Sequence, residues 1–190
     1  MALPAEETRY TFADALTWPE EDRIEIIYGE TYRMPMPLRV HQQISMELCR
    51  QISNFLVGKT CKVYPAPFNV RPFQENEDPP EDVDTMLEPD ITIVCDPNKL
   101  DKYGCKGAPD MIIEILSPSN RRHDLSVKYR IYQRAGVREY WIVDPDTKTV
   151  QTFKLEDGLY NVADVFTSES RVPVGIFEDF SVDLSMVFTE

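Results

Sequence analysis

A strand–helix–strand pattern between residues 110 and 144 constrains the fold of this chain more than any other feature. The segment 110–116, DMIIEIL, is almost continuously apolar, which is typical of a strand covered on both faces. A helix is predicted from about residue 124 to residue 135, ended by Gly136, and 138–144, REYWIVD, predicts the next strand. This order indicates a βαβ unit with two parallel strands and a right-handed crossover.

Further elements are predicted on both sides of this unit. The spacing of apolar residues predicts a hairpin in 24–34 around Gly29, a helix over 40–56, strands in 62–71 and 91–94, and an antiparallel meander after 144. Residues 73–88 hold seven acids and two adjacent prolines, which predicts an acidic mobile loop. The expected fold class is α/β (α+β), with one domain over residues 1–190, a mixed central β-sheet flanked by helices, and additional antiparallel hairpins.

Charge and cysteine content narrow the classes of function. The net charge of −13 repels phosphate backbones and argues against a general nucleic-acid coat protein. Six basic residues against one acid in 121–138 still allow local phosphate contact, or simply form a solvated helix face. The four cysteines contain no CxxC pair, which argues against a zinc site or a disulfide framework. Without a bilayer-spanning apolar run or a secretory signal, a cytoplasmic protein with no membrane partner is expected.

Two acids stand where apolar residues are expected. Glu114 lies inside the strand at 110–116, where an ionised carboxylate is costly unless a cation, a metal or hydrogen bonds compensate it. Asp90 opens the neighbouring predicted strand directly after Pro89. If the two strands are adjacent, both carboxylates converge at one end of the sheet and suit magnesium or manganese. The alternatives are a turn residue for Asp90 and a solvent-facing edge residue for Glu114.

A lysine on the apolar side of a helix is the third candidate. At about 100° per residue, Lys128 lies in the middle of the arc formed by Leu125, Ile131 and Tyr132. Its stem either lies along the core while the ammonium reaches water, or the ammonium reaches Glu114.

Two further residues are candidate accessory groups. His41 falls on the apolar side of the helix over 40–56, as a core residue, a capping residue or a member of the site. Asp124 precedes Lys128 by four residues and is a helix cap, an ion-pair partner or an accessory residue. A serine nucleophile and a glycine-rich phosphate loop find no support in the sequence.

Several phrases in this order resemble the Uma-type restriction-endonuclease-like family of the PD-(D/E)xK nuclease superfamily. They are EPDITIV at 88–94, APDMIIEILSPSN at 108–120, Lys128 with Tyr132, and GVREYWIVDP at 136–145. IIYGETYRMP and His41 resemble the family's N-terminal pattern. The resemblance implies a restriction-endonuclease-like core, with Asp90 as the acid of the PD motif and Glu114 as the acid of the next strand. Leu116 occupies the usual lysine position, and similar proteins supply the lysine from the following helix, which here gives Lys128.

Two acids, a lysine and a divalent ion suit phosphodiester hydrolysis. The leading hypothesis is a magnesium- or manganese-dependent endodeoxyribonuclease, with Asp90, Glu114 and Lys128 catalytic and the two acids as metal ligands. Arg121 and Arg122 are expected to contact DNA, and the protein is expected to form a homodimer. Two alternatives stay open: a catalytically degenerate nuclease fold that acts as a binding or interaction module, and a hydrolase of a small phosphorylated or nucleotide substrate.

Overall fold

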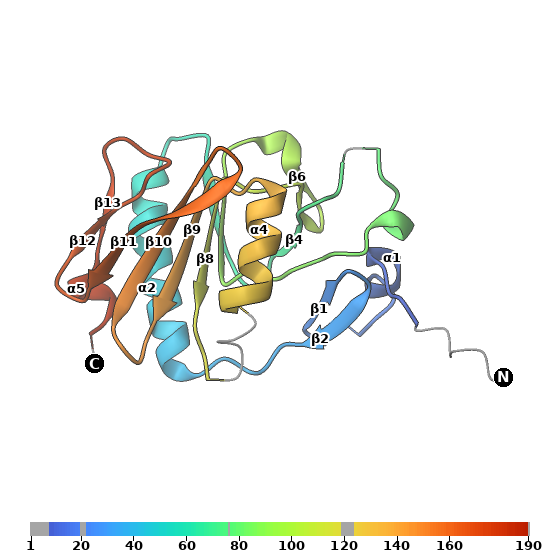
Figure 1. The fold of residues 1–190 in the computed structure, drawn as a ribbon, viewed down its shortest axis with the longest axis horizontal. Helices are drawn as coiled ribbons and strands as arrows, with labels where there is room; N and C mark the ends of the chain where they lie inside the picture. Colours follow the sequence, from blue (N-terminus) through green and yellow to red (C-terminus); the bar gives the residue numbers. More distant parts are fainter. Residues whose placement is uncertain (1–7, 20–21, 76, 119–123, 190) are drawn as a thin grey trace.

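A six-stranded mixed sheet forms the centre of the molecule (Figure 1). The computed structural model describes residues 8–19, 22–75, 77–118 and 124–189, and of residue 124 only the backbone. The strands of this sheet are β3 (Lys62–Pro65), β5 (Ile91–Val94), β8 (Met111–Ile115), β9 (Glu139–Asp144), β10 (Thr149–Glu156) and β11 (Leu159–Thr167). They lie in the order β11-β10-β9-β8-β5-β3, where β8 and β9 are parallel and all other neighbours are antiparallel.

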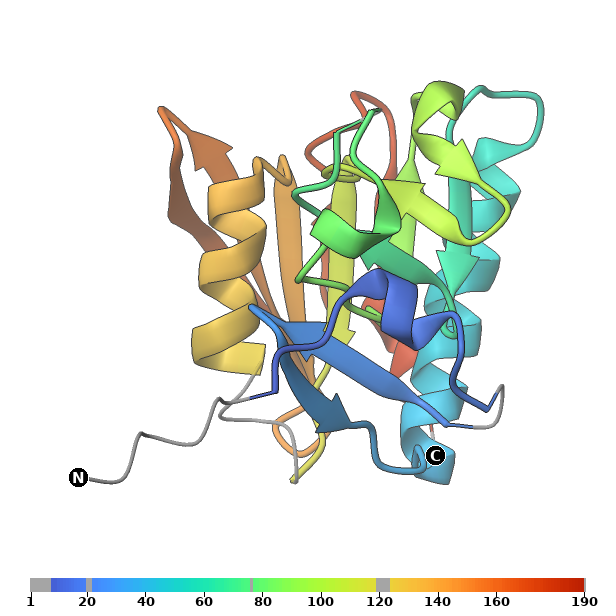
Figure 2. The ribbon, with the colours of Figure 1, turned by 90° about the vertical axis from the view of Figure 1, so that its right-hand side faces the viewer.

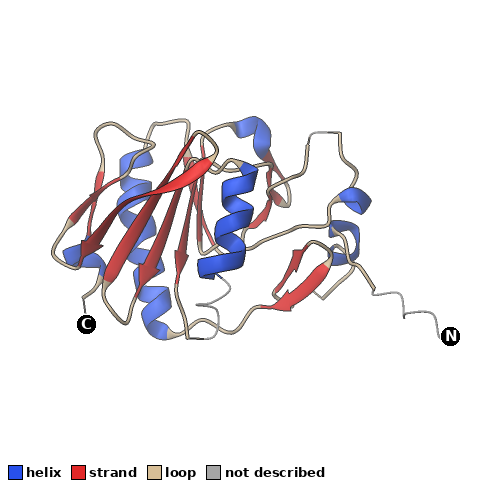
Figure 3. Cartoon of the chain, viewed as in Figure 1, coloured by secondary structure: helices blue, strands red, loops and turns tan. Residues whose placement is uncertain are grey.

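Helices cover both faces of this sheet (Figures 1 and 3). One face packs against α2 (Arg39–Leu56), α5 (Leu184–Val187) and the hairpin of β12 (Arg171–Pro173) and β13 (Ser181–Asp183). The other face packs against α4 (Tyr129–Ala135), which continues a π-helical turn, η3 (Asp124–Lys128), and ends at Gly136 with a φ of 92°. The predicted helices, the central strands and the parallel β8–β9 pair are confirmed.

The alternation of side chains along β8 decides what Glu114 meets. Met111, Ile113 and Ile115 belong to the core on the α2 side, whereas Ile112 belongs to the core on the α4 side. Successive residues of a strand point to opposite faces, so Glu114 shares the α4 side with Ile112. It is therefore buried beneath α4 at 1% exposure.

A smaller part of the structure lies beside the central sheet (Figure 2). It holds the predicted hairpin, formed by β1 (Ile24–Ile27) and β2 (Glu30–Arg33), and a three-stranded sheet of β4 (Asn69–Arg71), β7 (Gly104–Lys106) and β6 (Leu100–Asp101). Three short helices accompany them: α1 (Phe12–Ala15), η1 (Pro80–Asp82) and η2 (Pro97–Lys99). The cis Ala66–Pro67 bond lies between β3 and β4, within the single irregular strand predicted for 62–71.

The end of the acidic segment 73–88 connects these parts. Met86 forms a β-bridge with Ile26 of the hairpin, and Leu87 forms one with Val70 of the small sheet. Met86 and Leu87 are buried. The loop predicted here thus ends in a packed segment that leads directly into Asp90, while mobility of the segment stays a prediction.

Two expectations from the sequence are wrong. Cys61 and Cys95 form a disulfide across a separation of 34 residues, because they extend the antiparallel register in which Lys62 pairs with Val94. Leu125 is 42% exposed although the helical wheel placed it on the buried side. The wheel assumed a regular α-helix, and the π-helical turn over 124–128 changes the angle between successive residues there. In the part of the chain that the structure describes, no helix has the length and apolar character needed to cross a membrane.

Gly104 allows β4 and β7 to approach closely, and its replacement provides a test of the fold. Its φ is +141°, and a Cβ atom there would lie 2.0 Å from the backbone oxygen of Asn69. The positive φ alone should lower the free energy of unfolding of Gly104→Ala by ~1–2 kcal/mol. We expect a clearly larger loss, because the added Cβ also collides with the backbone of Asn69. Gly58→Ala is the matched control, because Gly58 has a φ of +78° but no heavy atom within 4 Å of the added carbon. Urea unfolding measures both, and equal losses would contradict the close approach.

Candidate active site

A buried lysine lies between two buried carboxylates beneath α4. The Nζ atom of Lys128 is 2.9 Å from Oε1 of Glu25 and 3.1 Å from Oε1 of Glu114. All three residues are 1% exposed. Charges removed from water to this degree are stable only when they compensate one another with good geometry. Lys128 therefore faces inward and contacts Glu114. This is the second of the two orientations that the sequence analysis left open.

Glu25 is the member of this cluster that the sequence analysis missed. It lies in β1, and its Oε1 also accepts a hydrogen bond of 3.0 Å from the backbone N–H of Glu88. Its sequence context, IEII, gives the same signal that selected Glu114: an acid between apolar residues of a predicted strand. Applied to both strands, that criterion would have found it.

Tyr132 of α4 also contacts Glu114. Its hydroxyl donates a hydrogen bond of 2.6 Å to Oε1 of Glu114, one helical turn beyond Lys128. Burial, followed by the charges of Glu114 and Glu25, raises the pKa of Tyr132 well above its ordinary value. The phenol therefore stays neutral and acts as a donor. Spacing four residues apart places both donors on one side of the helix.

Asp90 lies next to Glu114 across the sheet. Ile91 pairs with Ile113 in the antiparallel β5–β8 ladder, so Asp90 and Glu114 extend the same register by one step. The carboxylate of Asp90 accepts a hydrogen bond of 2.7 Å from the backbone N–H of Ile115. This bond fixes one oxygen, Oδ2, against the end of β8.

His41 approaches the same oxygen from the first turn of α2. Its Nε2 lies 3.1 Å from Oδ2 of Asp90, and its side chain is 12% exposed. Its other ring nitrogen, Nδ1, is buried and has no hydrogen-bond partner. The structure thus places His41 beside Asp90, so it is not a residue of the apolar core alone.

A second ion pair borders the cluster. Glu88 is 8% exposed and accepts a hydrogen bond of 2.7 Å from Nε of Arg23. Burial raises the pKa of Glu88, and the Arg23 guanidinium offsets this only in part. The region therefore contains two cations, Arg23 and Lys128, and four carboxylates. These carboxylates belong to Glu25, Glu88, Asp90 and Glu114.

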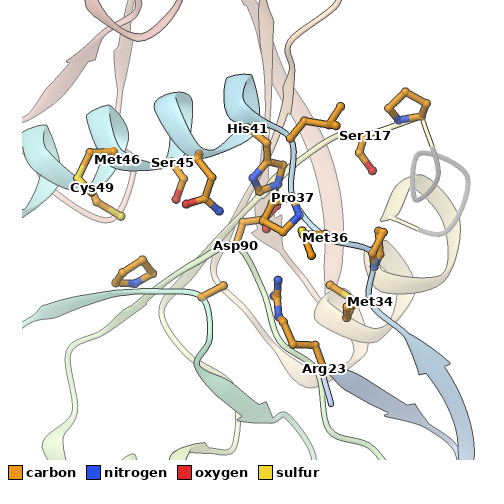
Figure 4. A pocket seen from close by; sticks show the side chains of 16 residues that line it. Arg23, Met34, Met36, Pro37, His41, Ser45, Met46, Cys49, Asp90 and Ser117 are labelled. Carbon is orange, nitrogen blue, oxygen red and sulfur yellow. Dashed lines mark ion pairs between the residues drawn. The ribbon is translucent and has the colours of Figure 1, made fainter. Parts of the chain in front are cut away.

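A cavity of about 500 Å³ opens beside Asp90 (Figure 4). Asp90 and His41 lie at one side of the cavity. Arg23, which directly precedes β1, lies near them. Glu114 and Lys128 do not line the cavity and lie beneath the surface. Among the candidate residues of the site, Asp90 is thus the acid that a ligand in the cavity can reach.

The donor atoms fit a hard divalent cation of the magnesium type. Magnesium in phosphate-handling sites is commonly held by one or two carboxylates together with water, and Asp90 and Glu114 supply that set. The excess of two carboxylates over cations in the region matches the charge of such an ion. Within the described residues no group of three or more histidine, cysteine or acidic side chains is placed to hold a metal, so a cage made entirely of protein side chains is not formed there.

The remaining predicted residues cannot be placed in the site. Arg121 and Arg122 lie outside the described residues. Asp124 begins η3, and its side chain is not described. Sharing of one ion between Asp90 and Glu114 stays a prediction.

Removal of Lys128 tests the charge balance of the buried cluster. We expect Lys128→Met to lower the free energy of unfolding by ~3–5 kcal/mol, because it leaves two buried carboxylates without their cation. In a Glu25→Gln background the loss should be smaller, since one of those carboxylates is then neutral. Arg130→Met is the control, because Arg130 is an exposed cation of the same helix. Urea unfolding of the four combinations measures the coupling, and an equal loss in both backgrounds would contradict the bridge.

The raised pKa of Glu88 predicts a pH dependence of stability. The folded state keeps the Glu88 proton to a higher pH than the unfolded chain, whose glutamate has a pKa near 4.5. The contribution of this group is therefore complete below pH 4.5 and is lost as the pH rises through the raised pKa. As the pH rises from 4.5 to 7, the unfolding free energy of Glu88→Gln should decrease less than that of the parent protein. Glu81→Gln, at an exposed position, should leave the slope unchanged.

Comparison with known proteins identifies the family and the fold of this chain. The chain matches the Uma2 family, described as "Putative restriction endonuclease", over residues 12–186. The "Uncharacterized protein slr1290" of Synechocystis is 24% identical over 173 residues, which cover 89% of this chain and 87% of that protein. The crystal structure of a "putative nuclease belonging to DUF820" from Anabaena variabilis superimposes with a TM-score of 0.73 at 23% identity, over 94% of this chain and 97% of the other, and shows the same fold.

The matched residues 12–186 include the elements that carry the site residues: β1, α2, β5, β8, η3 and α4. The predicted family and the predicted restriction-endonuclease-like fold class are therefore confirmed. The chain belongs to the Uma2 family.

Proposed function

We propose that this protein is a metal-dependent nuclease that hydrolyses phosphodiester bonds in DNA. The observation that carries the proposal is the buried Lys128–Glu114 ion pair at the end of the sheet where Asp90 borders an open cavity. A buried lysine and two acids of this kind are costly for stability. Their placement beside a cavity supports a chemical role, and the family description and that of the structural neighbour both name nucleases.

Asp90 and Glu114 are the residues that would hold Mg²⁺ or Mn²⁺. The Oδ2 atom of Asp90 is held by the N–H of Ile115 and by His41, and Asp90 lines the cavity, so its carboxylate could also contact a ligand there. A bound divalent ion polarises a phosphoryl oxygen and lowers the pKa of a coordinated water.

Lys128 supplies positive charge next to the acids. Its ammonium is held by Glu25 and Glu114 and by the packing of its stem under α4, so it needs no reorganisation during the reaction. A preorganised cation of this kind stabilises negative charge that develops on the phosphate. In this proposal Glu25 and Tyr132 are positioning residues that act through Lys128 and Glu114.

Substrate contact by the basic segment 121–138 belongs to the same proposal. Arg130, Arg134 and Arg138 are exposed among its described residues. Arg121 and Arg122, nearer the start of that segment, are proposed to contact phosphate, and assembly into a homodimer would bring two sites to the two strands of DNA.

One observation favours the second candidate, a degenerate nuclease fold that binds without catalysis. A single oxygen of Glu114, Oε1, already accepts from both Lys128 and Tyr132. A carboxylate that already accepts hydrogen bonds from an ammonium and a phenol binds a metal ion less strongly. Metal binding therefore separates the two candidates.

Metal titration and DNA cleavage together test the proposal. Calorimetric titration with Mg²⁺ and Mn²⁺ should give a binding signal that Asp90→Asn and Glu114→Gln abolish. Supercoiled and single-stranded DNA should be cleaved in the presence of either metal. Asp90→Asn and Lys128→Arg should each lower that rate by roughly 10²–10³-fold, the effect typical of losing one preorganised charge at a reacting centre.

Asp110→Asn is the matched control for these variants. Asp110 directly precedes β8 and accepts a backbone hydrogen bond of 2.7 Å from Cys95, much as Asp90 directly precedes β5 and accepts from Ile115. It does not line the cavity, so its variant should keep the parent rate. Cleavage at equal rates by both asparagine variants, or the absence of any metal-dependent cleavage, would overturn the proposal.

A further inference from the structure

The cavity beside Asp90 has apolar walls that the proposed chemistry does not use. The segment 34–38, with the sequence MPMPL, borders it on one side, and Pro65 and Ala66 border it on another. Met46 of α2 adds a third apolar contribution. These apolar side chains have no role in the hydrolysis of a phosphodiester. They would instead contact a ligand group that has apolar faces.

The rim of this cavity is unusually apolar for a protein surface. Met36 is 91% exposed, Leu38 is 61% exposed and Met46 is 71% exposed. Contiguous exposed apolar side chains around a concave site commonly mark binding of a ligand. Methionines also adapt their shape to the ligand that they contact.

Polar groups line only part of the cavity. Arg23, His41 and Asp90 lie near one another, and Ser45 lies on α2 beyond His41 (Figure 4). Gln42 of α2 also lines the cavity. A ligand that fits this distribution has a charged end, a flat apolar body and hydrogen-bonding edges. A volume of about 500 Å³ is within the range of small-ligand sites.

We infer that this cavity binds an unpaired nucleobase next to the phosphate under attack, an inference that rests on the proposed function. The phosphate lies at Asp90, and the base enters the apolar part, where its faces contact Met34 and Met36. Amide and hydroxyl groups of Gln42 and Ser45 face the edges of the base. The substrate class is therefore single-stranded or splayed polynucleotide, since a base paired in a duplex cannot enter the cavity.

The charge of the protein leads to the same substrate class. A net charge of −13 repels an extended duplex, whose phosphates are closely spaced on two strands. Contacts between the faces of a base and apolar side chains depend little on that field, and every base has such faces. Binding through a base thus compensates for weak attraction to the backbone.

The experiment compares three end-labelled DNA probes of equal strand length by fluorescence anisotropy, with Ca²⁺ in place of Mg²⁺. One probe is a single strand, the second is the corresponding duplex, and the third is a strand of abasic sugar-phosphate that keeps the charge but lacks every base. We expect the single strand to bind at least about tenfold more tightly than the abasic strand, because one base buries its faces against apolar side chains.

The variant Met34→Ala/Met36→Ala should weaken binding of the single strand about tenfold and leave binding of the abasic strand unchanged. Met186→Ala is the control, because Met186 is 48% exposed but does not line the cavity. Equal affinity for the base-bearing and abasic strands, tighter binding of the duplex, no binding of any probe, or no effect of the methionine variant would each overturn the inference.

Failure of the inference and failure of the proposed function give different results. Metal-dependent cleavage without base-dependent binding would keep the nuclease proposal and exclude the nucleobase cavity. Base-dependent binding that the methionine variant weakens, with no cleavage under any metal, would support the cavity and favour the binding module over the enzyme.

Discussion

The buried ammonium of Lys128 is the interaction on which the geometry of this site depends. It joins three parts of the chain that are far apart in sequence: the N-terminal hairpin through Glu25, the central sheet through Glu114, and the helix that carries the lysine. Two charges at 1% exposure and a third between them are stable only when all three are in place. Packing of the hairpin against the sheet is therefore coupled to the charge state of the site.

A second set of contacts positions Asp90, and it involves β-bridges and a backbone N–H donor together with His41. Met86 and Leu87 pair with the hairpin and with the small sheet, and the chain then enters β5 at Asp90. The hydrogen bond from Ile115 to Asp90 replaces a ladder bond at the point where the two strands end. The acid is thus held by rigid elements, which suits a group that must keep its place while a ligand binds.

The sequence predicted most of this arrangement because its signals are local. Short apolar runs located β5, β8 and β9, helical spacing and terminal glycines located the two main helices, and acids or a lysine among apolar residues located Glu114 and Lys128. Signals that depend on pairing in space were missed. The Cys61–Cys95 disulfide follows from the register of β3 and β5, and a separation of 34 residues does not reveal it. Glu25 has the same local context as Glu114 and could have been selected by it, but its pairing with Lys128, 103 residues further along the chain, has no local signal.

An acidic protein can bind a phosphate substrate when the charges near the site, and not the net charge, determine the interaction. Around Lys128, carboxylates exceed cations by two, so the proposed divalent cation would be attracted to this region and would reduce its repulsion of a phosphate. The remainder of the acidic surface lies outside this region and acts on the substrate only through a screened field, which falls off over about 8 Å at physiological ionic strength. A substrate held by one metal-bridged phosphate and one base in an apolar cavity presents little charge to that field. A duplex laid across the surface presents many phosphates to it, and this difference would select unpaired strands.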